Sequence, residues 1–163
     1  MNPEVRSSRD ETEAERLDRN LTELLNELRV ALPGVQVLFA FLLGVPFTQR
    51  FTELAPYLKD VYYGTLICAA AATAFLIAPS AYHRIEFRAS DKHHIVFVSN
   101  RLAIIGLGFL ALAMCGVVLV VTDFLFSGLA TATATTCVAL LFLVLWYVLP
   151  LRRRMHLMRR QAG

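Results

Sequence analysis

Apolar residues dominate the second half of the chain, where the fifty residues from Leu102 to Leu151 contain one charged side chain, Asp123. The hydrocarbon core of a bilayer is ~30 Å thick, so a helix that rises ~1.5 Å per residue needs about 20 apolar residues to cross it. Residues 102–122 and 124–151 both satisfy this requirement. The pattern therefore predicts two membrane-spanning helices joined by a short turn at Asp123.

Two earlier apolar runs meet the same length criterion. The first covers residues 30–49 and the second covers residues 61–82, and charged residues or histidines flank both. We therefore expect an all-α fold, a four-helix transmembrane bundle. With 56% hydrophobic residues, the 163-residue chain has room for a single membrane domain at 12–151 and for no separate catalytic domain.

The polar N-terminal region predicts a disordered tail at residues 1–11 and then an amphipathic helix at 12–32. Thr12 and Glu15 have the spacing of a capping box, which satisfies backbone N–H groups where a helix begins. One face of this helix collects leucines at spacings of three or four residues, namely Leu17, Leu21, Leu24, Leu25, Leu28 and Leu32. We expect this face to lie at the membrane interface, or to pack on the bundle or on a second copy. Pro33 is expected to mark the helix end.

Basic residues are distributed unevenly among the predicted loops. If the N-terminal tail, the loop between the second and third spans and the basic tail at 152–163 are cytoplasmic, 14 of the 16 Lys and Arg residues lie inside. The positive-inside rule favours this arrangement. We therefore expect a multi-pass protein of the bacterial plasma membrane, with its N- and C-termini in the cytoplasm and no cleaved signal peptide.

Small residues indicate which faces of the spans pack against other helices, because they let two helix backbones approach closely within a membrane. The second span carries them in the run Ala69–Ala72, with Ala74 and Ala78. The fourth span carries them at Gly128, Ala132 and Thr136, beside Ser127, Thr131 and Thr135. The bulky run Leu140–Leu145 offers no such face. We expect the small-residue faces to be buried and the bulky run to meet lipid.

Coupled ion transport requires an ionisable group within the bilayer. The candidates here are Asp123, at the outer turn, and Gln36, the strongly polar side chain of the first span. Gln36 is interpreted as a hydrogen-bond partner between helices, and Asp123 as a solvated turn residue. No nucleophile with a base, phosphate-binding loop or metal-ligand spacing occurs in the sequence. We therefore expect no enzymatic activity, no cofactor and no metal site.

The predicted cytoplasmic loop between the second and third spans contains the richest chemistry. Arg84 and Arg101 are candidate clamps for an anionic headgroup or another acidic ligand, with His83 and Asn100 beside them. The histidines of this loop could report pH, because imidazole titrates near neutrality. The alternative is that these positive charges set the membrane topology and have no further role.

Three stretches resemble a known family: RLDRNLTELLNELRVALPGVQVLFAFLLGVPFTQRF, LIAPSAYHRIEFR and SNRLAIIGL. This is a family of small four-span membrane proteins of unknown function from high-GC Gram-positive bacteria. Its members are often labelled automatically as sodium:proton antiporters, and the resemblance implies that label for this chain. The family brings no established site residues.

Together these observations favour a non-enzymatic membrane module that binds a partner protein, a lipid or another copy of itself. The expected partners are the lipid bilayer and either a homo-oligomer or a membrane protein, and no nucleic acid is expected. The alternative function is a small sodium/proton antiporter, which would have to use Asp123 or Gln36 for ion coupling.

Overall fold

The computed structural model describes residues 13–85, 92–126, 128–153 and 155, and all regular structure within them is helical. In chain order the α-helices are α1 (Glu13–Gly44), α2 (Gln49–Thr52), α3 (Pro56–Ile85), α4 (Lys92–Leu125) and α5 (Leu129–Leu143). The 3-10 turn η1 (Val45–Phe47) follows α1, and the π-helical turn η2 (Val144–Val148) follows α5. Helical structure then continues to Arg153.

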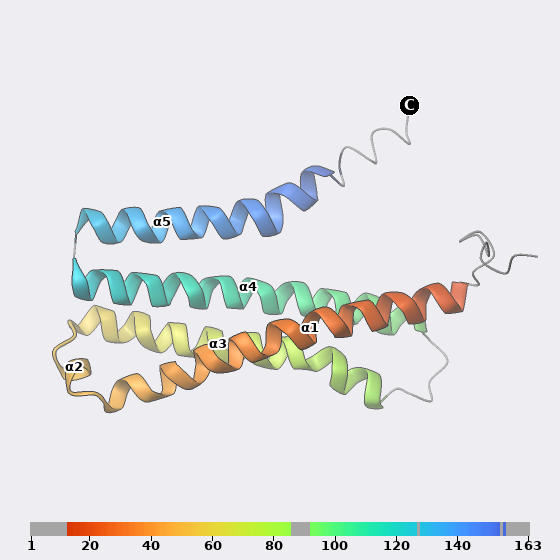
Figure 1. The fold of residues 1–163 in the computed structure, drawn as a ribbon, viewed down its shortest axis with the longest axis horizontal. Helices are drawn as coiled ribbons and strands as arrows, with labels where there is room; N and C mark the ends of the chain where they lie inside the picture. The colour runs from red at the N-terminus through yellow and green to blue at the C-terminus, as the bar shows by residue number, and fades with distance from the viewer. Residues whose placement is uncertain (1–12, 86–91, 127, 154, 156–163) are drawn as a thin grey trace, which may run out of the picture.

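Four of these helices are long and apolar enough to cross a membrane, at Glu15–Phe47, Pro56–Tyr82, His94–Leu125 and Leu129–Arg153. This confirms the prediction of an all-α fold with four candidate spans. Figure 1 shows the four long helices antiparallel in chain order, with α2 in the connection between α1 and α3. We call the end of the bundle that contains α2 the loop end. The opposite end, where α3 finishes and α4 begins, is the charged end.

The centre of the molecule is the contact between α3 and α4, which pack along most of their length. Small residues make this close approach feasible. A Cβ atom built on Gly116 of α4 would lie 2.0 Å from the hydroxyl oxygen of Thr65 in α3, and one built on Gly106 would lie 2.8 Å from Leu76. Ala69 and Ala72 of α3 are completely buried, which confirms the packing face predicted for the second span.

The α1 helix continues through Pro33, so the prediction that Pro33 marks a helix end is wrong. A proline inside a helix removes one backbone hydrogen bond, which normally favours a kink or an end. Here Leu28 and Val35, on either side of the proline, are buried in one core cluster with Leu76 of α3. Their burial holds both halves of α1 on the same surface and outweighs the lost bond.

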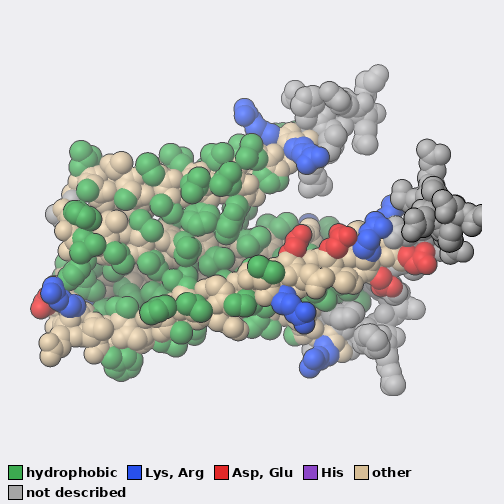
Figure 2. Space-filling model, viewed as in Figure 1, with side chains coloured by type: hydrophobic (Ala, Val, Ile, Leu, Met, Phe, Trp, Pro, Cys, Tyr) green, Lys and Arg blue, Asp and Glu red, His purple; other side chains and the backbone are tan. Residues whose placement is uncertain are grey.

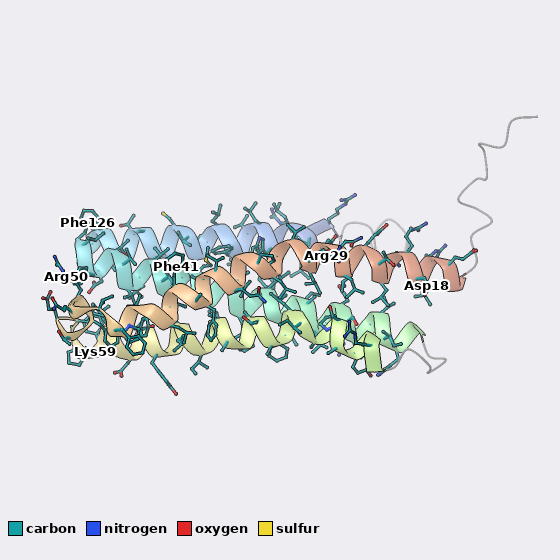
Figure 3. The ribbon with its side chains drawn as sticks, turned by 60° about the horizontal axis from the view of Figure 1, so that its bottom comes forward. Asp18, Arg29, Phe41, Arg50, Lys59 and Phe126 are labelled. Atoms are coloured by element: carbon teal, nitrogen blue, oxygen red, sulfur yellow. The ribbon has the colours of Figure 1, made fainter. Side chains whose placement is uncertain are left out.

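The leucine face of α1 packs against the bundle, which is one of the two placements expected for it. Leu21 and Leu28 are buried, and Leu24 and Leu32 lie against the cluster that includes Ala103 of α4. The charged face of the helix points away from this contact. As a result α1 extends well beyond Arg29 toward the charged end as a protein-supported arm, with Asp18 near its far end (Figure 3).

The α5 helix is peripheral, because among the described helices it contacts α4 and its own continuation η2. Thr131 is buried and Thr135 is half-buried, whereas Gly128, Ala132 and Thr136 are exposed, so the predicted burial of the small-residue face is found on its Thr131–Thr135 side and is wrong for the other side. A helix with one neighbour can bury one face. The bulky run from Leu140 to Leu145 is largely exposed, as expected for a lipid-facing surface.

Candidate functional site

The best-formed polar feature at the charged end is Arg101 of α4, which stacks on a ring of its own helix. Arg101 is exposed, and its guanidinium carbon lies 4.4 Å from the centre of the Phe97 ring. Residues four apart on a helix lie one above the other, so this contact follows from the local sequence. Stacking occupies the flat face of the guanidinium and leaves its N–H edges available for an anion.

The side of α4 that carries Arg101 changes its exposure along the helix. Toward the loop end, Gly108, Ala111 and Cys115 on this side are half-buried beneath α5. Toward the charged end, Phe97 and Ile104 are 56% and 47% exposed. Therefore α5 covers the middle of α4 and leaves its charged end open.

The π-helical turn η2 marks the place where α5 leaves α4. Tyr147 lies in this turn, and its hydroxyl would be 2.9 Å from a Cβ atom built on Gly108, so the two helices touch at this point. A π-helical turn changes the direction and the residue phase of a helix. Beyond it, Figure 1 shows the chain bending away from α4 toward the exposed residues Arg152 and Arg153.

Counting residues from the contact between Tyr147 and Gly108 puts Arg152 and Arg153 at roughly the same level of the bundle as Arg101. They are five and six residues beyond Tyr147, whereas Arg101 is seven residues before Gly108 on the antiparallel helix. At ~1.5 Å per residue, each group is roughly 8 to 10 Å from the point where the helices touch. We call the space between Phe97, Arg101 and Ile104 on one side and Arg152 and Arg153 on the other the α4–α5 hollow.

Figure 2 shows a hollow between the end of α5 and α1, in front of the charged end of α4, with basic side chains at the end of α5 and acidic side chains along the facing edge of α1. Glu23 and Glu27 lie one turn apart on α1. Glu23 lies on the same side of α1 as Phe41, which is five helical turns farther along the chain. Phe41 lines a cavity together with Val121 of α4, so this side of α1 faces α4. Glu23 also pairs with Arg19 at 3.8 Å, through exposed side chains. The hollow thus has a cationic wall, an acidic wall and an apolar floor.

The residues predicted to form an anion clamp come from two helices, α3 and α4. Arg84 is exposed near the end of α3, and Asn100 is exposed on α4 beside Arg101. Within the described residues no ion pair, hydrogen bond or ring contact joins Arg84 to Arg101. The His83 side chain lies outside the described part, and His94 lies near Tyr82, with ring centres 6.4 Å apart.

Sequence reasoning overlooked Arg152 and Arg153, because it interpreted the C-terminal basic residues as topology signals. It also overlooked Phe97. The four-residue spacing of Phe97 and Arg101 could have indicated their contact, since such pairs stack on a helix surface. No sequence pattern shows that α5 bends away at Val144–Val148.

Asp123, one of the two ion-coupling candidates, connects two helices at the loop end. It lies in the last turn of α4, is half-buried, and accepts a hydrogen bond from the Tyr57 hydroxyl of α3. Asp123 thus lies in the last helical turn and not in the connection after it, and its bond to Tyr57 is solvent-exposed. Nearby, the Arg50 guanidinium lies 5.9 Å from the centre of the Phe124 ring and 4.0 Å from the Glu53 carboxylate.

Gln36, the other candidate, is exposed on α1. Its side-chain amide makes no hydrogen bond to any other residue that the structure describes, so the expected partner on a neighbouring helix of this chain is not found there. The described residues also contain no group of three His, Cys, Asp or Glu side chains suited to a metal ion.

Two neighbouring cavities lie at the loop end: one of about 190 Å³ between α4 and the connection from α1 to α3, and one of about 140 Å³ between α1, α3 and α4. They share Val45, Val120 and Val121, and nearly all of the remaining lining is apolar. Such a surface suits hydrocarbon and offers little to orient a polar ligand. The polar candidate site is therefore the α4–α5 hollow.

Comparison with known proteins gives a family without an assigned activity. Residues 10–150 match a family of unknown function, DUF6328. No curated protein and no solved structure matches the chain.

Proposed function

The chain belongs to this family of unknown function, and from its geometry we propose that it is a non-enzymatic membrane module that binds a phospholipid headgroup in the α4–α5 hollow. One observation carries the proposal. The arginine stacked on Phe97 lies on an uncovered face of α4, at the same level as the two arginines at the end of α5.

The lengths of the helices support a position for these arginines at the level of the headgroups. Residues 102–122 of α4 contain no charged side chain, and 21 residues at ~1.5 Å each span ~31 Å, about the thickness of a bilayer core. Arg101 is the first charge beyond that stretch, and Arg152 is the first beyond the fourth span. Ile104 and Ile105, both partly exposed, would then meet the upper part of an acyl chain.

The chemistry of the hollow suits a phosphodiester. Guanidinium groups donate paired N–H bonds to phosphate oxygens and hold their charge at any physiological pH. The acidic edge at Glu23 and Glu27 disfavours a headgroup that is purely anionic and favours one that also carries an amine. We therefore propose an aminophospholipid, such as phosphatidylethanolamine, as the ligand. We also propose that the charged end faces the cytoplasm of a bacterial cell, as the positive-inside rule favours.

Lipid retention measured by native mass spectrometry tests this site. Arg101→Gln combined with Arg152→Gln should lower retention of phosphatidylethanolamine, because a charge near the membrane surface contributes about 1 kcal/mol, or roughly fivefold, per residue. Arg84→Gln is the matched control, since it removes an exposed arginine from the same end but outside the hollow. Equal retention by the wild type and the double variant, or an equal loss in Arg84→Gln, would contradict the proposal.

A further inference from the structure

Gln36 places a polar amide on the outside of a candidate membrane span. It lies in α1 seven residues after Arg29, or ~10 Å farther along the helix, and it is exposed. Val35, the preceding residue, is 1% exposed and faces the core, so the amide points to another side of the helix. Within the described chain this amide has no hydrogen-bond partner.

An amide facing hydrocarbon is costly, because no water is present to satisfy its N–H and C=O groups. Its side chain is too short to reach the headgroup region from this depth. Interhelical hydrogen bonds from glutamine are a common solution in membrane proteins. The exposed amide therefore indicates that another polypeptide covers this face of α1.

The surroundings of Gln36 would admit a second helix at short range. Ala40 and Gly44 follow it at intervals of four residues on the same side of α1, and both are exposed. A Cβ atom built on Gly44 would meet nothing within 4 Å, so the backbone there borders open space. The face thus combines a hydrogen-bonding group with room for close approach of a helix.

We infer that a second copy of this chain covers the face, forming a homodimer in which the two Gln36 side chains hydrogen-bond to each other across a twofold axis. A side-chain amide carries both donors and an acceptor, so it complements an identical amide related by twofold symmetry. A second copy supplies that group at the same depth in the membrane. The inference is independent of the proposed lipid site, because Gln36 and the hollow involve different faces and different residues.

Energy transfer between full-length copies, labelled at the C-terminus with donor or acceptor dyes in phosphatidylethanolamine/phosphatidylglycerol vesicles, tests the dimer. The wild type should dimerise, and Gln36→Leu should weaken dimerisation about tenfold, equivalent to about 1.4 kcal/mol. Gln36→Asn should restore much of the affinity, since it restores an amide. Gly34→Ala is the matched control, because Gly34 is exposed, lies about 160° around the helix from Gln36, and would meet nothing within 4 Å of an added Cβ atom. A monomeric wild type, or a dimer unaffected by Gln36→Leu, would overturn the inference.

Disulfide cross-linking locates the interface independently of affinity. In a background with Cys68, Cys115 and Cys137 replaced by Ala, Gln36→Cys should form an intermolecular disulfide under mild oxidation. Gly34→Cys, which is also exposed but lies about 160° around the helix, should cross-link several-fold less. Equal cross-linking at both positions would show random collision and refute a specific contact at Gln36.

Discussion

At the scale of single residues, glycines determine how closely α3 and α4 approach each other. Gly116 faces Thr65, a residue that is 4% exposed and whose hydroxyl donates a 2.7 Å bond to the Val61 carbonyl of its own helix. A methyl group on Gly116 would collide with that hydroxyl oxygen. The sequence shows the glycine but does not identify its neighbour, because Thr65 lies 51 positions away in the chain.

Gly116→Ala should destabilise the protein by about 1 to 3 kcal/mol, because a close-packed contact must open to admit the new methyl group. Thermal unfolding in mild detergent measures the effect as a lower Tm. Gly64→Ala serves as the control, since a Cβ atom on Gly64 meets nothing within 4 Å and alanine is the better helix former. If Gly116→Ala unfolds at the same temperature as Gly64→Ala, the packing account of this contact fails.

Asp123 bears on the antiporter alternative. Exchange would require an ionisable group that both sides of the membrane can reach. Asp123 lies at the loop end and accepts a hydrogen bond from Tyr57, and the 21 residues that precede it in α4 carry no charge. In this position Asp123 links α4 to α3 through its hydrogen bond with Tyr57. It offers no support for ion exchange by a single copy of the chain.

At the scale of secondary-structure elements, periodicity predicted the helices well and their boundaries less well. The leucine spacing indicated the buried face of α1 correctly, because burial of one face follows directly from a 3.6-residue period. The expected end at Pro33 was wrong, since tertiary packing at Leu28 and Val35 stabilises the helix across the proline. The bend after α5 had no sequence signal.

The N-terminal arm of α1 should detach when its buried leucines become charged. Leu21→Glu with Leu28→Glu should release residues 15–28, because burial of each leucine contributes about 1.5 to 3 kcal/mol. Hydrogen exchange of this segment should accelerate by more than tenfold. Thr22→Glu with Asn26→Glu is the control, because both residues are exposed on the same turns. Unchanged protection in the leucine variant would contradict the packing of this arm.

At the scale of the whole molecule, hydropathy predicted the number of spans but not their neighbours. In a membrane, lipid and protein are equally apolar, so a leucine that faces lipid resembles one that faces another helix. For this reason the sequence could not show that α5 contacts α4 alone among the described helices. The α4–α5 hollow follows from that peripheral position, which the sequence does not reveal, and so the sequence paired Arg101 with Arg84 in its candidate anion site and not with Arg152.

The most direct test of the account is to identify what occupies the α4–α5 hollow. A photoreactive side chain at position 104, within the hollow, is compared with one at Leu112, which is 60% exposed elsewhere on α4. After detergent purification, mass spectrometry should find phosphatidylethanolamine cross-linked at position 104. That adduct should fall several-fold when Arg101→Gln and Arg152→Gln are added, while any adduct at position 112 stays unchanged. Equal labelling at the two positions would contradict a headgroup site in the hollow. So would labelling at position 104 that is unchanged when the two arginines are replaced.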